Sequence, residues 1–282
     1  ERFPEYKGRE IYFAGQSYAG GHFVPQLAQI VLQRNNQNSI NLRGVLLGNP
    51  KLDQAVEVDG VYDYLLGHAL ISHENMDEIK RVCPTGDSKK TINNDECLAA
   101  KKKIDDQIKY LDHKNIYADV CLNPTLTRET TTIEFDPCSE YYVKAYLNTA
   151  QAQEAIHVKP TKWEHCNNVQ VTNKWSSDDS AASMLPILQE LMAKGIRVWV
   201  YSGDLDSTVP MMATWKVMRK MNLTVENTWS AWFTEGQVGG YTHVFKGNVT
   251  FATVRGSGQN VASDQPIRAL TLFISFIRNT LI

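Results

Sequence analysis

The chain has 282 residues, of which 43% are hydrophobic and 21% are charged, an ordinary composition for a globular protein. Its net charge of −2 gives no electrostatic attraction for nucleic acid. No apolar run approaches the ~20 residues that would span a bilayer, so we expect neither a nucleic-acid partner nor a membrane anchor. The lysine run Lys101–Lys103 is expected on a solvated helix face. This length suits one domain, or a core domain with an inserted lid.

The first predicted elements are a strand over 10–14, a helix over 20–33 and a second strand over 42–47. Between the first two, the stretch "AGQSYAGG" places Ser17 at a tight strand-to-helix turn. Such a turn exposes the serine hydroxyl, and the backbone N–H after it faces the developing oxyanion. An ordinary glycine-rich turn is the alternative, since Ala19 departs from the strict G-x-S-x-G pattern.

The middle of the chain, about 54–179, is polar, holds all five cysteines and lacks strong strand runs. "VDGVYDYLLGHALIS" and "ENMDEIKRVC" predict helices, with Ser72 as a possible N-cap between them. We interpret this region as an inserted lid on a core formed by residues 1–53 and 180–282, within one domain.

Strand and helix alternate again after the middle region. A helix is predicted over 180–194, with Gly195 as its stop, followed by a buried strand over 196–202. "NVTFATVRGSG" supplies another strand, and residues 267–278 a closing helix. Alternating strands and helices imply a mostly parallel sheet covered on both faces.

A serine hydrolase of this kind orders its triad as serine, acid and histidine along the chain. Asp204 and Asp206 follow a late strand, where the acid is expected, although both could simply cap a loop. The stretch after the last strand, "FATVRGSGQNVASDQP", has the right context for the histidine but offers Gln259 instead.

Two sequons, at Asn222 and Asn248, fit glycosylation in a secretory route. Five cysteines leave one unpaired if the others form disulfides. Together these features favour an oxidising compartment. The chain starts without Met and without an apolar leader, which is expected of a mature product or a fragment.

Five motifs resemble the serine carboxypeptidases and serine carboxypeptidase-like proteins of plants, in the order of that family and across essentially the whole chain. They are "ERFPEYKGREIYFAGQSYAG", "GHALIS", "WVYSGDLDSTVP", "QVGGYT" and "FATVRGSG". The resemblance implies an α/β-hydrolase fold with a helical lid insertion, here lacking the N-terminal strands. It also implies release of C-terminal residues from peptides through an acyl-enzyme, without cofactor or metal. A vacuolar or extracellular location and a homodimer are further implications.

By the same resemblance, each site position has a family role. Ser17 matches the nucleophile. The backbone N–H of Tyr18 matches one of the two donors of the oxyanion hole, and Asp206 matches the acid of the triad. The family histidine falls on Gln259, and Gln16 replaces a glutamate that helps hold the carboxylate of the substrate.

Four departures from the family pattern favour impaired catalysis. Gln259 has no pKa near neutrality and cannot act as general base. Gln16 can still donate a hydrogen bond to a carboxylate, with an altered pH dependence. Gly21 is an extra residue that could tilt the helix after the serine. The N-terminal third of the family, with its "NGGPG" segment, is expected to be missing.

The resemblance also implies how the cysteines pair. It implies disulfides between Cys83 and Cys97 and between Cys121 and Cys138, and a partner for Cys166 that lies outside the chain. A free buried thiol at Cys166 is the alternative.

Other histidines are weak candidates for the base. His243 precedes the last strand, and His22 lies one turn past the serine with its ring expected to point away. His68 is interpreted as a structural lid residue. No His or Cys spacing suggests a metal site.

The sequence therefore favours an impaired member of the peptidase branch. The alternatives are activity in a longer protein with a compensating base, a non-catalytic peptide-binding module, and an acyltransferase. The strand over 10–14, or a neighbour, is expected to be an unpaired apolar edge that makes the 282 residues alone poorly stable.

Overall fold

A computed structural model describes residues 2–35, 39–83, 94–122, 136–166, 171, 174–175 and 183–282. The chain divides into two compact units. The first comprises Glu1–Lys109, His113–Ile116 and Ala182–Ile282, and the second Tyr110–Asp112 and Tyr117–Ala181. The helices from 54 to 109 thus group with the sheet, and the lid limits at 54 and 179 stay a prediction.

A mixed sheet forms the centre of the first unit. Within the described residues it has six strands in the order β1-β2-β3-β6-β5-β4. The pairs β1–β2, β2–β3 and β3–β6 are parallel, whereas β5 runs antiparallel to both β6 and β4. In chain order the strands are Glu10–Gln16, Asn41–Gly48, Arg197–Gly203, Val225–Thr234, Gln237–Phe245 and Val249–Val254. The predicted parallel strands are confirmed, but the β4–β5 hairpin was not predicted.

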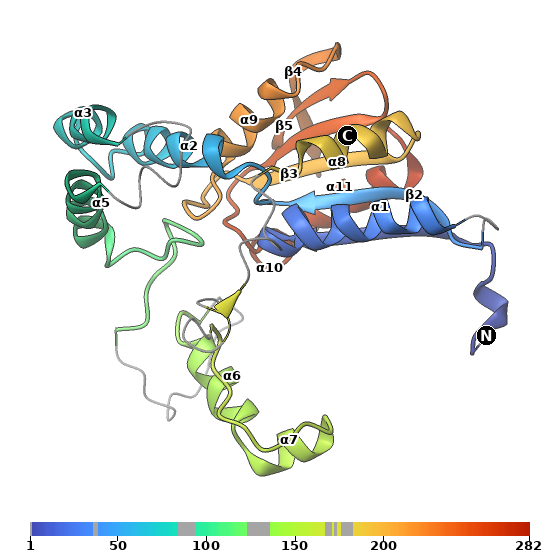
Figure 1. The fold of residues 1–282 in the computed structure, drawn as a ribbon, viewed down its shortest axis with the longest axis horizontal. Coiled ribbons are helices and arrows are strands. Elements are labelled where there is room, and N and C mark those ends of the chain that lie inside the picture. Colours follow the sequence, from blue (N-terminus) through green and yellow to red (C-terminus); the bar gives the residue numbers. More distant parts are fainter. Residues whose placement is uncertain are drawn as a thin grey trace. The chain divides into compact units, whose positions relative to one another are not determined.

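Helices cover both faces of this sheet (Figure 1). The helices α1 (Val24–Arg34), α8 (Leu185–Ala193) and α9 (Met211–Lys220) contribute to one apolar core. The helix α11 (Pro266–Arg278) packs against the other face. Gly195, at φ +77°, follows α8 as the predicted stop.

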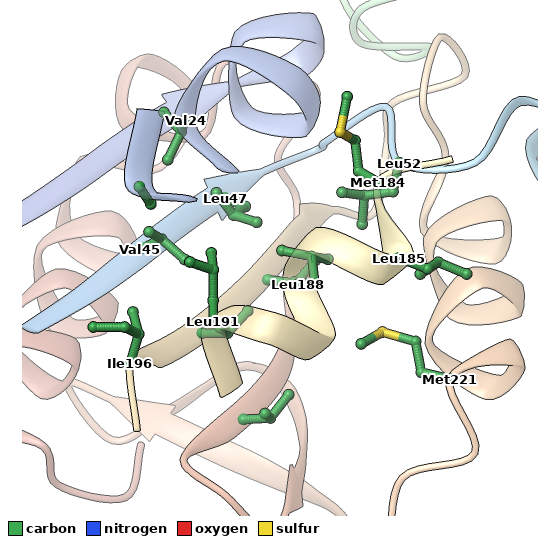
Figure 2. Close-up of a cluster of buried hydrophobic side chains, with 14 of the residues drawn as sticks. Val24, Val45, Leu47, Leu52, Met184, Leu185, Leu188, Leu191, Ile196 and Met221 are labelled. Atoms are coloured by element: carbon green, nitrogen blue, oxygen red, sulfur yellow. The ribbon is translucent and has the colours of Figure 1, made fainter. Parts of the chain in front are cut away.

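The central strands are apolar on both faces because both faces are buried. In β2, Val45 and Leu47 point into the core beneath α1 and α8, whereas Leu46 belongs to the core beneath α11. Figure 2 shows Val45 and Leu47 beside Leu188 and Leu191 of α8. Full burial of each such side chain contributes about 1.5–3 kcal/mol relative to exposure.

Among the described residues, β2 is followed within the first unit by the helices α2 (Gln54–Gly67), α3 (His73–Val82) and α5 (Asp95–Ile108). Ser72 caps α3 and forms a capping box with Asn75, which confirms the predicted N-cap. A disulfide between Cys83 and Cys97 joins the end of α3 to α5.

The second unit contains α6 (Ser139–Leu147) and α7 (Ala150–Ala155). A disulfide joins Cys121 to Cys138, the residue directly before α6. Glu164 forms ion pairs with Lys144 at 2.6 Å and with Lys162 at 3.0 Å. Three short elements in the first unit complete the described structure: η1 (Pro4–Tyr6), η2 (Ala19–Phe23) and α10 (Val261–Asp264).

Candidate active site

Ser17 lies in the turn that joins β1 to the helix after it. Its backbone φ is +56°, in the left-handed region that residues with a Cβ rarely adopt. The strand and helix approach so closely that a Cβ on Gly20 would lie 2.5 Å from the Gly15 carbonyl oxygen. The Ser17 carbonyl accepts a hydrogen bond from the Lys51 N–H at 3.2 Å, which fastens the turn to the segment after β2. This strained, glycine-flanked geometry is that of a nucleophile elbow.

The helix after Ser17 begins with a π-helical turn, Ala19–Phe23. The Val24 N–H donates to the Ala19 carbonyl, five residues back, so this turn holds one residue more than an α-helical turn. A Cβ on Gly21 would overlap the carbonyl oxygen of Lys51. Gly21 therefore lies in a widened turn that packs against the segment after β2, which fits the expectation of an extra residue here.

The rings of Tyr18 and His22 stack within this turn. Their centroids are 4.2 Å apart and their planes differ by 9°. The imidazole is buried, with 8% of the residue exposed. His22 is therefore part of the packing of the elbow.

Asp206 is fully buried after β3. Its carboxylate accepts hydrogen bonds from Asn49 Nδ2 at 2.8 Å, Thr208 N at 2.7 Å and Val209 N at 3.3 Å. Burial raises the pKa of Asp206 to about 6, although these hydrogen bonds act in the opposite direction. None of these donors belongs to Gln259.

Asp204 has a different task from Asp206. It accepts hydrogen bonds from the backbone N–H groups of Gly256 at 2.7 Å and Ser257 at 3.3 Å. Burial raises the pKa of Asp204, and the same two hydrogen bonds oppose the rise. Asp204 thus caps the loop that follows β6, which is the alternative role that the sequence left open for it.

Gln259 lies in that loop, with only 8% of the residue exposed. Its backbone N–H donates to the Lys114 carbonyl at 2.7 Å. Its side-chain Nε2 is buried and has no hydrogen-bond partner among the residues that the structure describes. A buried amide donor without an acceptor costs free energy.

The neighbours of Ser17 and Gln259 contact each other. Gln16 donates a hydrogen bond from Nε2 to Asn260 Oδ1 at 2.8 Å. The structure therefore brings the end of β1 and the loop after β6 together, although these residues are 244 positions apart.

The candidate residues share one edge of the sheet. Ser17, Asp206 and Gln259 follow β1, β3 and β6, which run parallel, so all three lie beyond the carboxyl ends of strands. Asn49 follows β2 at the same edge and was not predicted as a site residue. Its signal was the polar "GNP" that ends a buried strand, but only the strand order shows that it faces Asp206.

The other two histidines considered as a base, His243 and His68, have packing roles. The His243 ring in β5 stacks against Phe245 at 4.5 Å and Trp215 at 5.3 Å, and burial lowers the pKa of His243. The His68 Nδ1 lies 2.9 Å from the Tyr64 carbonyl oxygen, and the two rings are 4.0 Å apart. In the described part of the chain, no group of three or more His, Cys, Asp or Glu side chains could hold a metal ion.

The structure contains the two disulfides that the resemblance implies, and Cys166 is a free, exposed thiol. The sequon residues Asn222 and Asn248 are both exposed at turns with positive φ. Among the described residues, no helix is long and apolar enough to cross a membrane.

The sequence of the chain is similar to a known protein family. The family model described as serine carboxypeptidase matches residues 1–279. Serine carboxypeptidase-like 37 and 36 of Arabidopsis thaliana are 51% and 52% identical over 99% of this chain. The chain spans only 58% and 59% of those relatives.

The fold has a counterpart among solved structures. Kex1, a prohormone-processing carboxypeptidase from Saccharomyces cerevisiae, superposes with a TM-score of 0.75 at 17% identity, covering 99% of this chain and 64% of that chain. This likeness supports the α/β-hydrolase fold.

Proposed function

Because this chain belongs to the serine carboxypeptidase family, we propose that its site is built for releasing C-terminal residues from peptides and is catalytically impaired in these 282 residues. The observation that carries the proposal is Gln259, a buried amide in the loop after β6 beside the turn of Ser17.

The proposed roles follow the geometry of the sheet edge. Ser17 is the nucleophile, and its strained turn presents the hydroxyl. The Tyr18 N–H is one oxyanion donor. Asp206, held by Asn49, is the acid of the triad, and Gln259 occupies the position of the base.

The impairment follows from proton transfer. As the Ser17 Oγ attacks a peptide carbonyl carbon, its proton must pass to a base, which then returns it to the leaving amine. The Gln259 amide has no basic nitrogen. Asp206 does not replace it, since its oxygens already accept hydrogen bonds from Asn49, Thr208 and Val209. Loss of a triad member costs several powers of ten in rate.

A second candidate function is peptide binding without turnover. The Gln16–Asn260 pair places amide groups beside Ser17, and the unpaired Nε2 of Gln259 is a further donor. Amide N–H groups can bind the carboxylate of a peptide C-terminus without any change of protonation.

The remaining proposals concern location and assembly. Two disulfides suit an oxidising compartment, so we place the protein in the secretory pathway, ending in the vacuole or outside the cell, with glycans on Asn222 and Asn248. A homodimer is also proposed. Loss of mass on treatment with a glycosidase, and light scattering, test these points.

Turnover of an N-blocked dipeptide tests the main proposal. The purified chain and its Ser17→Ala variant are assayed at pH 4–7. We expect turnover of the chain to be near that of the variant, and peptide affinity to be equal in both. Rapid, Ser17-dependent release of the C-terminal residue would overturn the proposed impairment.

A further inference from the structure

A cavity lies between α2, α3, α5 and α9, and none of its lining residues belongs to the candidate active site. Its volume is about 290 Å³. Val58, Met76 and Ile79 give it apolar walls, together with the disulfide-bonded Cys83. This volume is near the lower end of the range of about 300–1,000 Å³ for small-molecule sites, so the cavity suits a ligand the size of an amino acid.

Charged groups of both signs line the same cavity. Lys216 pairs with Asp63 at 2.5 Å, which neutralises one charge of each sign. Asp59, Lys80 and Lys101 also line the cavity, and no ion pair joins them to any described residue. One carboxylate and two ammonium groups at this cavity therefore have no ion-pair partner among the described residues; Asp59 and Lys101 are half-buried, and Lys80 is exposed at the rim.

Tyr62 adds a hydroxyl to this lining. Burial, and to a smaller extent the charge of Asp105, raises the pKa of Tyr62 to about 12. The hydroxyl therefore stays protonated at physiological pH and remains a hydrogen-bond donor.

The lysine run on α5 separates into different environments. Lys103 forms an ion pair with Glu78 at 3.0 Å, and Lys102 is exposed. Lys101 alone of the three lines the cavity. The predicted solvated face therefore holds for Lys102 and Lys103 but not for Lys101.

We propose that this cavity binds a free amino acid with an apolar side chain. Its carboxylate is held by Lys80 and Lys101, its ammonium group by Asp59, and its side chain by the apolar wall around Met76. A simple carboxylic acid would leave Asp59 without a partner, and a simple amine would leave both lysines without one. The apolar wall disfavours an inorganic anion. Binding here does not depend on catalysis by Ser17.

Calorimetric titration tests the proposal with three compounds that share one apolar chain. These are L-leucine, 4-methylpentanoate, which lacks the amine, and 3-methylbutylamine, which lacks the carboxylate. We expect leucine to bind one to one and more tightly than the other two. Equal affinities for leucine and 4-methylpentanoate would overturn the assignment of Asp59, and no binding of leucine at millimolar concentration would overturn the site.

Neighbouring lysines supply a matched pair of variants. Lys101→Gln removes a charge that lines the cavity, and Lys102→Gln removes an equal charge from the exposed face of the same helix. We expect the first to weaken leucine binding about tenfold or more, the effect of losing one charge-assisted hydrogen bond, and the second to leave it unchanged. Equal effects of both variants, or of neither, would contradict the proposal.

The place of binding has its own readout. With methyl-labelled methionine, leucine should shift the Met76 signal, assigned by a Met76→Leu variant, and leave that of Met184 in the sheet core unchanged. A leucine that binds elsewhere would leave the Met76 signal unmoved, and the proposed site would then be wrong.

Discussion

Gln16 donates a hydrogen bond from Nε2 to the Oδ1 of Asn260 at 2.8 Å, which joins the residue before Ser17 to the residue after Gln259. Both partners are amides, which do not titrate in the physiological range. A carboxylate bound beside this pair would therefore meet the same donors at every pH from 4 to 7.

The affinity for a peptide C-terminus should accordingly vary little between pH 4 and pH 7. Gln16→Glu introduces a carboxyl group with an ordinary pKa of about 4.3, which ionises and repels the peptide carboxylate as the pH rises. We expect the affinity of that variant to fall by about tenfold over this range, measured by fluorescence polarisation. Gln237→Glu, at the exposed start of β5, is the control. A wild-type affinity that falls as steeply as that of Gln16→Glu would contradict this role.

The pKa of Asp206 makes a prediction about stability. Its folded-state pKa of about 6 lies above its ordinary value of 3.8, so ionisation opposes folding. The contribution of Asp206 to stability is therefore full below pH ~4 and is lost as the pH rises to about 6. The melting temperature of Asp206→Asn, relative to that of the wild type at the same pH, should therefore be higher at pH 7 than at pH 4.

The size of this effect has an upper bound. A shift of about two pKa units corresponds to at most about 3 kcal/mol. The asparagine also leaves at least one of the donors from Asn49, Thr208 and Val209 unsatisfied at every pH, so the test is the difference between the two pH values. If the melting temperatures of Asp206→Asn and the wild type differed by the same amount at pH 4 and at pH 7, the pKa of Asp206 would not be raised.

The π-helical turn depends on Gly21. In Gly21→Ala, the added methyl group would overlap the Lys51 carbonyl, and we expect a loss of about 2–3 kcal/mol or more in the free energy of unfolding. Gly67→Ala, at the end of α2, meets no atom within 4 Å and should be neutral or slightly stabilising. Urea unfolding of both variants provides the comparison, and equal midpoints would contradict the close approach of this turn to Lys51.

Much of this fold could be predicted because the strands are apolar runs bounded by glycine and polar residues. The strands over 10–14, 42–47 and 196–202 agree with β1, β2 and β3 within a few residues at their ends. The β4–β5 hairpin was missed because β4 is an exposed edge strand whose burial does not alternate.

The site could be predicted only in part. Ser17 stands out because its turn needs small neighbours that are adjacent in the sequence. Asn49 and Asn260 gave no such signal, because their contacts with Asp206 and Gln16 depend on the order of the strands in the sheet. The π-helical turn likewise packs against Lys51, which is 30 residues from Gly21.

The edge strand β1 predicts self-association of the chain. In the described residues β1 is an edge strand, and Leu27 of α1 and Leu270 of α11 expose 48% and 56% of their surface on the helices that cover the two faces. Unpaired strand edges and apolar patches promote aggregation. Leu27→Glu combined with Leu270→Glu should slow aggregation, followed by light scattering, without lowering the melting temperature. A monomeric wild-type chain with a cooperative, high-temperature melt would contradict this expectation.

The rate at which a fluorophosphonate labels Ser17 tests the central claim most directly, because that reaction needs an activated serine. We expect slow labelling of the wild type, an increase of about a hundredfold or more in Gln259→His, and no labelling when Ser17→Ala is added. Rapid, stoichiometric labelling of the wild type, unchanged by Gln259→His, would show that Gln259 does not limit this site.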